Sequence, residues 1–322
     1  MRIPEPLKRG DHIRIIAPSR SASILSEKGI TQAKKHLEEL GLHVSFGEYA
    51  FECDLHSSSS VEHRIADLHA AFSDHQVDGI LTAIGGFNSN ELLPYIDFEM
   101  IRLHPKVFCG YSDITALANA ITAKCDFVTY SGPHFSSFHM EQMQEEQTAM
   151  FQACIMNGKS FELSPSIKWS DDAWYLDQVN RQFYQTEWKV YQEGQAEGML
   201  YGGNLCTLNL LQGTPYMPSL KDTVLFVEDD ELVFPEMFAR DLTSILQHAE
   251  TLNGLVIGRF QKKSNMTDEH LRFILDKHPI LKTIPVIYDV DFGHTQPVLT
   301  FPIGGKVKLC SKEKQIQMTI SK

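Results

Sequence analysis

Two stretches decide the fold: DGILTAIGG, from Asp78 to Gly86, and VFCGYSD, from Val107 to Asp113. Each begins as a short apolar run, which is typical of a buried strand, and ends abruptly at glycine and polar residues. A helical pattern over 114–124 follows the second stretch directly. Strands that alternate with helices in this way predict a mostly parallel sheet with helices on both faces.

The same alternation extends in both directions along the chain. Before residue 78, strands are expected at 12–18 and 42–46, and helices at 28–40 and around residues 65–72. After residue 198 we expect strands at 223–227, 254–257 and 286–290, helices at 237–252 and 268–277, and a hairpin of 307–309 with 315–320. These elements predict an α/β protein of two parts.

The N-terminal domain, residues 1–160, is predicted to hold a doubly wound, mostly parallel sheet. A smaller C-terminal α/β domain is predicted over residues 198–322. Residues 161–197 are polar and aromatic, and we interpret them as a linker with a long loop or hairpin, since long irregular loops are commonly functional.

Composition excludes several classes of protein. The chain of 322 residues has a formal net charge of −12, which argues against nucleic-acid binding because that binding depends on cationic contacts to phosphate. No stretch approaches the length of a membrane span or resembles a signal peptide, so a cytoplasmic protein without membrane contact is expected. The cysteines are scattered and are predicted to be free, buried thiols, not disulfides or zinc ligands: Cys53, Cys109, Cys125, Cys154, Cys206 and Cys310.

Polar residues follow several of the predicted strands, and ligands of open α/β sheets bind at such strand ends. The stretches are GGFNSN at 85–90, GYSD at 110–113, EDD at 228–230 and DVDFGH at 289–294. In the first stretch, the glycines at 85 and 86 would allow a ligand to come close to the backbone N–H groups. A phosphate or dinucleotide cradle is disfavoured there, because neither Gly-x-Gly-x-x-Gly nor Gly-Lys-Ser/Thr is present.

Ser112 lies on a sharp strand-to-helix turn that resembles a nucleophile elbow, although Ile114 stands where the second glycine of that motif would be. The alternative is that Ser112 or Asp113 caps the helix. His294 is either a catalytic base or, with Asp289 and Asp291, part of a metal site, since carboxylates and imidazole suit several divalent ions.

These motifs together resemble a known family. The chain contains APS at 17–19, GGFNSN at 85–90, GYSDITAL at 110–117, GGNL at 202–205, ED at 228–229 and DFGHT at 291–295 followed by Pro297. In this order they are similar to the serine peptidase family of LD-carboxypeptidases, and most closely to its microcin immunity branch.

The resemblance implies a catalytic triad. Ser112 would be the nucleophile, His294 the general base and Glu228 the carboxylate that orients it, although Glu228 alone could also belong to an acidic turn. The backbone N–H groups of Gly86 and Asp113 would form the oxyanion hole. The resemblance further implies that the triad assembles between the domains, and that the enzyme is a cytoplasmic homodimer without metal or cofactor.

The substrate stays open at this point. An immunity-type peptidase would cleave the amide of a peptidyl or aminoacyl nucleotide, whereas an LD-carboxypeptidase would remove the terminal D-alanine of a murein tetrapeptide. A non-catalytic nucleotide-binding module is the alternative from another class. The matching motifs add Asn88 and Asn204 as candidate substrate-binding residues.

Aromatic residues bear on this choice. The three tryptophans, Trp169, Trp174 and Trp188, all fall within 161–197. These rings could simply pack a loop against the domain surface. A nucleotide substrate would instead stack its base on one of them, because such stacking contributes about 1–3 kcal/mol per base. Trp174 is the predicted platform, with Trp188 as the second choice.

Overall fold

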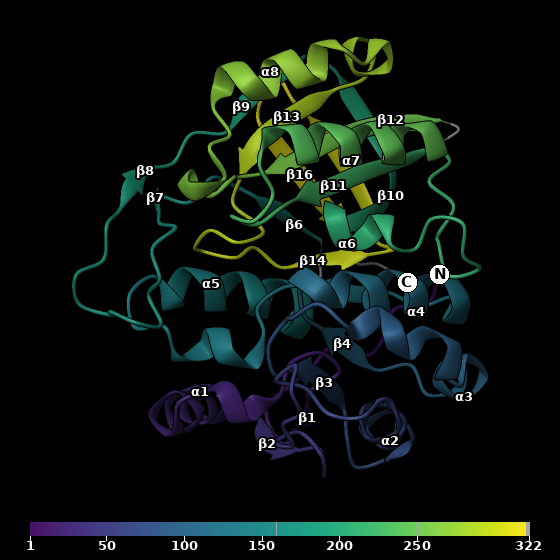
Figure 1. Ribbon diagram of the computed structural model, residues 1–322, viewed down its shortest axis with the longest axis vertical. Helices are drawn as coiled ribbons and strands as arrows, with labels where there is room; N and C mark the ends of the chain where they lie inside the picture. Colours follow the sequence, from purple (N-terminus) through teal and green to yellow (C-terminus); the bar gives the residue numbers. More distant parts are fainter. Residues whose placement is uncertain (159, 250, 320–322) are drawn as a thin grey trace.

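The computed structural model describes residues 1–158, 160–249 and 251–319. Its first sheet has the strand order β14-β5-β4-β3-β1-β2 (Figure 1). Strands β1 to β5 run parallel, and β14 pairs antiparallel with β5. Their bounds are β1 (His12–Ile16), β2 (His43–Phe46), β3 (Gly79–Thr82), β4 (Val107–Cys109), β5 (Thr129–Ser131) and β14 (Phe301–Ile303).

Helices cover both faces of this sheet. Figure 1 shows α1 (Glu27–Glu39) and α5 (Gln144–Phe151) on one side, and α2 (Val61–Ser73) and α3 (Phe98–Leu103) on the other. Adjacent strand residues point to opposite faces, so Ile80 packs into one hydrophobic core and Leu81 into the other. Both faces are therefore buried, as expected for a doubly wound sheet.

The second sheet has the order β6-β16-β15-β10-β11-β12-β13-β9. Its centre, β10 to β13, is parallel, and the flanking strands are antiparallel. The strands are β6 (Phe161–Leu163), β9 (Lys189–Gln192), β10 (Gln195–Asn204), β11 (Thr223–Glu228), β12 (Leu252–Gly258), β13 (Val286–Val290), β15 (Lys306–Cys310) and β16 (Gln315–Thr319). The helices of this half are α6 (Leu205–Asn209), α7 (Pro235–His248) and α8 (Asp268–Asp276).

The predicted α/β class, with a parallel-rich N-terminal sheet and a second C-terminal sheet, is confirmed. The sheets do not divide strictly along the chain, however. β14 lies late in the sequence yet extends the first sheet, whereas β6 and β9 come from the expected linker and pair with the second. The rest of the linker holds a hairpin of β7 (Lys168–Trp169) and β8 (Tyr184–Gln185). The predicted tail hairpin forms, and its expected last residue, Ile320, lies outside the described residues.

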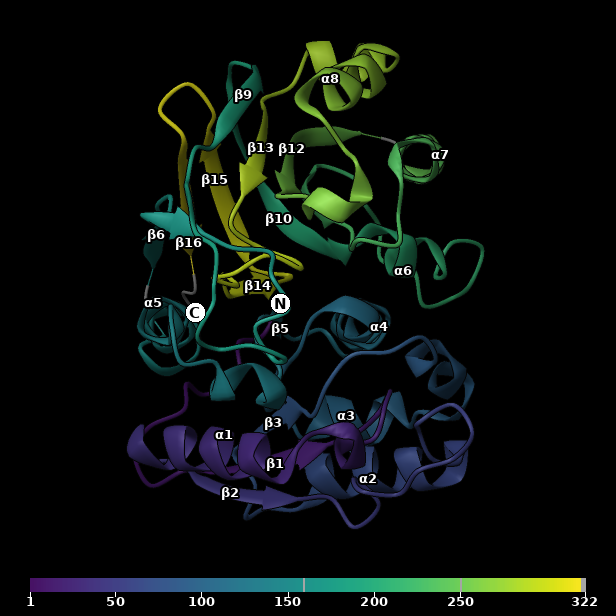
Figure 2. The same ribbon diagram turned by 60° about the vertical axis from the view of Figure 1, so that its left-hand side comes forward.

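Helix α4 (Thr115–Cys125) lies between the two sheets (Figure 2), and its side chains form hydrogen bonds with β10. Asn119 donates its Nδ2 to the Gly202 carbonyl at 2.8 Å and accepts the Gly202 N–H at 3.2 Å. The Asn204 N–H donates to Thr115 Oγ1 at 3.0 Å. A Cβ on Gly203 would lie 2.5 Å from the same hydroxyl, so only glycine permits this close approach. The helix that follows Ser112 is thereby fixed against β10.

Two further expectations can be compared with the structure. In the described part of the chain, no helix is long and apolar enough to span a membrane. The described cysteines are free, but the expectation that all are buried is wrong: Cys53 is exposed, and Cys206 and Cys310 are partly exposed. Cys53 lies in the irregular stretch between β2 and α2, where no strand or helix covers it.

Candidate active site

Three polar side chains from distant parts of the sequence meet between the sheets. Ser112 follows β4, Glu228 is the last residue of β11, and His294 follows β13. The distance between Ser112 Oγ and His294 Nε2 is 3.0 Å, and that between His294 Nδ1 and Glu228 Oε2 is 2.8 Å. A nucleophile, a base and an orienting carboxylate in this sequence of contacts have the geometry of a hydrolase triad.

The backbone at Ser112 makes a tight turn. Its φ is +59°, in the left-handed region that a serine seldom adopts. The helical turn from 112 to 114 has no side-chain cap, and neither does α4, so the capping interpretation of Ser112 and Asp113 is wrong. The unusual backbone instead directs the hydroxyl toward His294.

The Asp113 carboxylate organises the loop after β3. Asp113 is buried, and its Oδ2 accepts hydrogen bonds from Ser19 Oγ at 2.6 Å, Asn88 N at 3.0 Å and Ser89 N at 2.9 Å. Three motifs that are far apart in sequence thus converge on one carboxylate. This contact holds the loop that contains Gly86 next to the turn that carries Ser112.

The Gly85-Gly86 backbone lies against Ser112. A Cβ on Gly85 would lie 3.1 Å from Ser112 Cβ and 3.2 Å from its Oγ, and a Cβ on Gly86 would lie 2.2 Å from Ser19 Oγ. Any side chain here would crowd the nucleophile or push the loop away. The oxyanion role of the Gly86 and Asp113 N–H groups stays a prediction, but both belong to segments that border the hydroxyl.

The three acidic residues at the end of β11, Glu228 to Asp230, have different environments. Glu228 is 2 % exposed and faces His294. Asp229 is also buried, but its Oδ1 accepts the Cys206 N–H at 3.3 Å, away from the triad. Burial, followed by the charge of Glu228, raises the pKa of Asp229. Asp230 accepts the Leu232 N–H at 2.9 Å in a turn. The acidic-turn interpretation therefore suits Asp230, whereas Glu228 is the carboxylate that contacts the histidine.

His294 is a stronger base than an isolated imidazole. Burial alone would lower its pKa, but the Glu228 carboxylate opposes that effect and, with Asp230 and Asp229, raises the pKa of His294 to about 9. An imidazole accepts a proton only when it is neutral, so the fraction of active base grows with pH up to this value.

A pH dependence follows from this pKa. For an uncharged amide substrate, kcat/KM is expected to rise with pH and to level off above about pH 9, because only neutral His294 can deprotonate the serine. In Glu228→Gln the midpoint should shift to lower pH, because the carboxylate charge that stabilises the imidazolium is gone. Rate profiles of both proteins from about pH 6 to about pH 10 measure this. A midpoint that is the same in both would contradict it.

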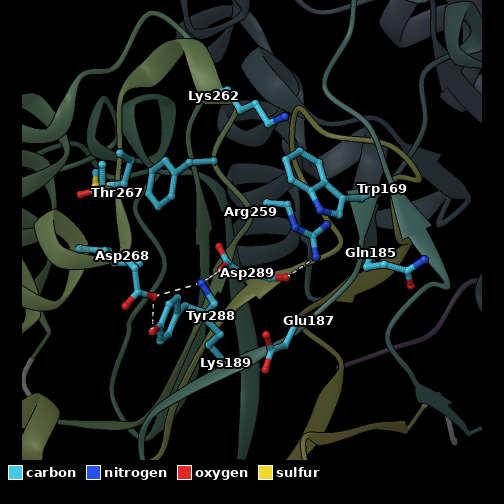
Figure 3. Close-up of a pocket in the computed structure, with 13 residues that line it drawn as sticks. Trp169, Gln185, Glu187, Lys189, Arg259, Lys262, Thr267, Asp268, Tyr288 and Asp289 are labelled. Carbon is cyan, nitrogen blue, oxygen red and sulfur yellow. Dashed lines mark hydrogen bonds and ion pairs between the residues drawn. The ribbon is translucent and has the colours of Figure 1, made fainter. Parts of the chain in front are cut away.

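The metal alternative is not supported by the positions of its residues. Asp289 Oδ2 is paired with Lys189 Nζ at 3.2 Å, on the wall of a cavity of about 330 Å³ (Figure 3). Asp291 is paired with Arg259, and His294 faces the other members of the triad. Within the described residues, no group of three His, Cys, Asp or Glu side chains is arranged to hold a metal ion.

Asp291 instead ties the His294 loop to its surroundings. Asp291 is fully buried, and besides the guanidinium of Arg259 it accepts Trp188 Nε1 at 2.9 Å and Ser166 N at 3.0 Å. A buried charge is tolerated when it is paired and hydrogen-bonded in this way. The network therefore fixes the segment three residues before the His294 imidazole.

The tryptophans occupy three different environments. Trp188 is fully buried, so it offers no face to a base, and its prediction as a platform is wrong. The indole N–H of Trp188 needs a buried acceptor, and Asp291 supplies one.

Trp169 stacks on Arg259, with 4.9 Å between the Trp169 ring centroid and Cζ, in the cavity of Figure 3. Trp174 is partly exposed and packs on His139 at 4.7 Å between ring centroids. Of the two predicted platforms, only Trp174 has an accessible ring.

The two predicted asparagines have local partners. Asn204 is buried, and its Oδ1 caps α6 by accepting the Thr207 N–H at 3.0 Å. Asn88 is partly exposed in the Gly86 loop, where its Oδ1 is 3.5 Å from Ser19 Oγ. Substrate binding by either residue stays a prediction.

Comparisons with known proteins identify the family of the chain. Family models described as the LD-carboxypeptidase N-terminal and C-terminal domains match residues 13–132 and 197–309. The chain belongs to the LD-carboxypeptidase family. The resemblance stated from the motifs is thereby confirmed, and the family is one of serine-type carboxypeptidases.

Curated relatives of this chain have different names. It is 51 % identical to the putative carboxypeptidase YocD of Bacillus subtilis, over 94 % of each chain. It is 30 % identical to a probable murein peptide carboxypeptidase of the same species, over 97 % of this chain and 92 % of the relative. It is 28 % identical to the microcin C7 self-immunity protein MccF of Escherichia coli, over 98 % and 94 %.

Solved structures show the same fold. An MccF-like protein of Bacillus anthracis is 49 % identical, with a TM-score of 0.97 over 99 % of both chains. The complex of MccF with glutamyl sulfamoyl guanosine is 26 % identical, with a TM-score of 0.88 over 98 % of both chains.

Sequence reasoning missed His134, which lies beside Ser112 and His294. His134 is buried after β5, and its Nδ1 is 2.7 Å from Thr82 Oγ1. Its Nε2 has no hydrogen-bond partner in the described structure and would lie 3.3 Å from a Cβ on Gly85. Burial, followed by the charges of His294 and Arg20, lowers the pKa of His134 to about 3. The available signal was a histidine three residues after the end of a strand.

Proposed function

We propose that this chain is a serine hydrolase that cleaves an amide bond next to an aminoacyl or peptidyl group, with Ser112, His294 and Glu228 as its triad. The observation that carries the proposal is the continuous pair of contacts, 3.0 Å and 2.8 Å, from the Ser112 hydroxyl through His294 to a buried carboxylate. The family of serine-type carboxypeptidases supports the reaction class.

The geometry accounts for each chemical step. His294 Nε2 takes the proton as Ser112 Oγ attacks the carbonyl carbon, and the resulting oxyanion would be stabilised by the Gly86 and Asp113 N–H groups. His294 then gives this proton to the departing nitrogen, which leaves an acyl-serine. A water molecule, deprotonated by the same imidazole, releases the acid and regenerates the hydroxyl.

For the substrate we favour an aminoacyl or peptidyl nucleotide. The support comes from relatives: MccF has been solved with glutamyl sulfamoyl guanosine and with aspartyl sulfamoyl adenosine. In this chain, the partly exposed Trp174 ring offers a surface on which a base could stack. The direct test is to incubate the purified protein with an aminoacyl sulfamoyl adenosine and to detect the released amino acid.

Cleavage of a murein tetrapeptide is the second candidate. The observation that favours it is the 30 % identity to a probable murein peptide carboxypeptidase over nearly the whole chain. Incubation with the tetrapeptide, followed by chromatography of the released D-alanine, tests it. Faster cleavage of this substrate than of the nucleotide would reverse our choice.

A Trp174→Ala variant separates the two candidates. We expect it to weaken binding of an aminoacyl sulfamoyl adenosine by about five- to a hundred-and-fiftyfold, the loss that removal of one stacked ring produces. Cleavage of simple peptides should be unchanged. Tyr175→Ala, which removes the exposed neighbouring ring, is the matched control. If Trp174→Ala weakened both substrates equally, Trp174 would only support the structure of its loop. If it weakened neither, another residue would have to stack on the base.

Labelling of Ser112 distinguishes an enzyme from a binding module. A fluorophosphonate is expected to modify Ser112 in the native protein and not in Ser112→Ala, because only an activated hydroxyl reacts. The cytoplasmic homodimer implied by the resemblance and the domain limits at 160 and 198 stay predictions. Light scattering would determine the number of subunits.

A further inference from the structure

Arg20 places a cation beside the predicted oxyanion hole. Its Nε donates to the Gly85 carbonyl at 3.3 Å, and its backbone N–H donates to the same oxygen at 3.4 Å. A Cβ on Gly86 would lie 2.9 Å from Arg20 Cγ, so the side chain runs along the Gly85-Gly86 backbone. A Cβ on Gly85 would lie 3.2 Å from Ser112 Oγ, so the residue that accepts the Arg20 hydrogen bonds also borders the Ser112 hydroxyl.

The charge of Arg20 is not neutralised by the part of the chain that the structure describes. No described carboxylate lies within 4.0 Å of its guanidinium, and its terminal nitrogens donate to no described group. Arginines that are mostly buried elsewhere in the fold do have carboxylate partners: Arg14 with Asp74, Arg64 with Glu91, Arg181 with Asp172 and Arg259 with Asp291. A partly buried guanidinium without such a partner points to an anion supplied by a ligand.

We propose that Arg20 binds the negative charge that the substrate carries on the leaving side of the scissile amide. This inference rests on the proposed function and assigns a substrate class to the same site. Its two terminal nitrogens can form the paired hydrogen bonds that arginine makes with carboxylate-like groups. The charge of Arg20 also contributes to the low pKa of the neighbouring His134, which agrees with its place at the site.

Both candidate substrates have this chemistry. In a peptide, the terminal carboxylate is separated from the scissile nitrogen by a single carbon, and in an acyl sulfamate the charge is shared by the atoms that adjoin the scissile bond. An acidic side chain on the acyl group lies several bonds farther from the carbonyl. A cation that is fixed at Gly85, next to Ser112, therefore suits the leaving-side anion of either substrate.

The test uses two pairs of substrates that differ in this charge. The first pair is a tetrapeptide ending in D-alanine and its C-terminal amide. The second is an aminoacyl sulfamoyl adenosine and the uncharged amide formed from the same amino acid and 5′-amino-5′-deoxyadenosine. We expect Arg20→Gln to lower kcat/KM about 10- to 100-fold on the charged member of the cleaved pair, mainly through KM, and by less than about threefold on the neutral member.

Two controls separate binding from support of the backbone. Arg20→Lys keeps the charge and should recover part of the loss, and Arg102→Gln, on the exposed end of α3, should change neither substrate. Equal losses on charged and neutral substrates would overturn the proposal, because they would show that Arg20 only supports the Gly85 loop. The proposal would also be overturned if the loss of kcat/KM in Arg20→Gln depended on an acidic side chain in the acyl group and not on the charge of the leaving group.

Binding measurements keep this inference distinct from the proposed function. In a Ser112→Ala background, calorimetry compares the affinity for the charged and neutral members without any cleavage. If the wild-type protein cuts none of the four substrates, the proposed function fails, and the Arg20 inference is still decided by this affinity ratio. If the ratio of affinities for the charged and neutral members were the same with Arg20 and with Arg20→Gln, the Arg20 inference would be refuted.

Discussion

Ser112→Ala and His294→Ala are each expected to lower kcat for amide hydrolysis by about 10⁴- to 10⁶-fold, because the members of a triad act as a unit. The serine variant loses the atom that forms the acyl intermediate. The histidine variant leaves the hydroxyl protonated, since the only contact of Ser112 Oγ given by the described side chains is to His294 Nε2. Steady-state rates on the preferred substrate, with burst analysis of the acyl-enzyme, measure both effects.

Folding is not expected to suffer in these variants. Ser112 and His294 are partly exposed, and neither belongs to the hydrophobic cores, so thermal unfolding should change little. Ser73→Ala is a suitable matched control because the Ser73 hydroxyl, at the exposed end of α2, donates to the His69 carbonyl and not to the triad. If His294→Ala retained near-full activity with an intact fold, another group would have to be the base.

Much of this arrangement could be predicted from the sequence, and the reason is local. The β4 strand was predicted with the bounds that it has in the structure, because VFC is a short apolar run that ends at glycine. The sharp turn at Ser112 followed from the direct passage of this strand into a helix. Residues 223–227 and 286–290 were clear for the same reason, which placed Glu228 and His294 just after strands.

Other features depend on contacts that no local pattern contains. β14 is only three residues long, includes Pro302, and exists because it pairs with β5 at the edge of the first sheet. Proline at such an edge leaves no strand signature in the sequence. Likewise, Trp188 appeared available as a platform because its segment is polar. In the structure the Trp188 ring is buried in a hydrophobic core, and its N–H donates to Asp291, which is 103 residues away.

The site itself shows the same division. The motifs named Gly86, Asp113 and Ser19, but the contact that joins them is the Asp113 carboxylate, with Ser19 Oγ at 2.6 Å. Arg20 immediately follows the first motif, yet nothing in the sequence shows that its guanidinium lies along Gly85. Such relations depend on how three strand ends are placed side by side, which only the assembled sheet determines.

Gly293→Ala is expected to disable the enzyme without replacing any member of the triad. A Cβ at this position would lie 2.3 Å from Glu228 Oε2 and 2.6 Å from Cδ, far inside van der Waals contact, so the carboxylate must move away from His294. The imidazole then loses the group that fixes its tautomer and balances its charge. We expect kcat to fall about 10³- to 10⁴-fold, close to the effect of losing the carboxylate in other triads.

The backbone at Gly293 supplies a control for this prediction. Its φ is +96°, where an alanine is strained by about 1–2 kcal/mol regardless of its neighbours. Gly10 has the same φ of +96°, and a Cβ there would meet nothing within 4 Å. Gly10→Ala should therefore show a similar small loss in Tm with normal kcat, whereas Gly293→Ala should lose activity as well.

Because the displaced carboxylate no longer raises the pKa of His294, the residual activity of Gly293→Ala should also reach its plateau at lower pH than that of the native enzyme. Equal kcat values for the two alanine variants would show that Glu228 can move aside without cost, and that its contact with His294 is not what drives the reaction.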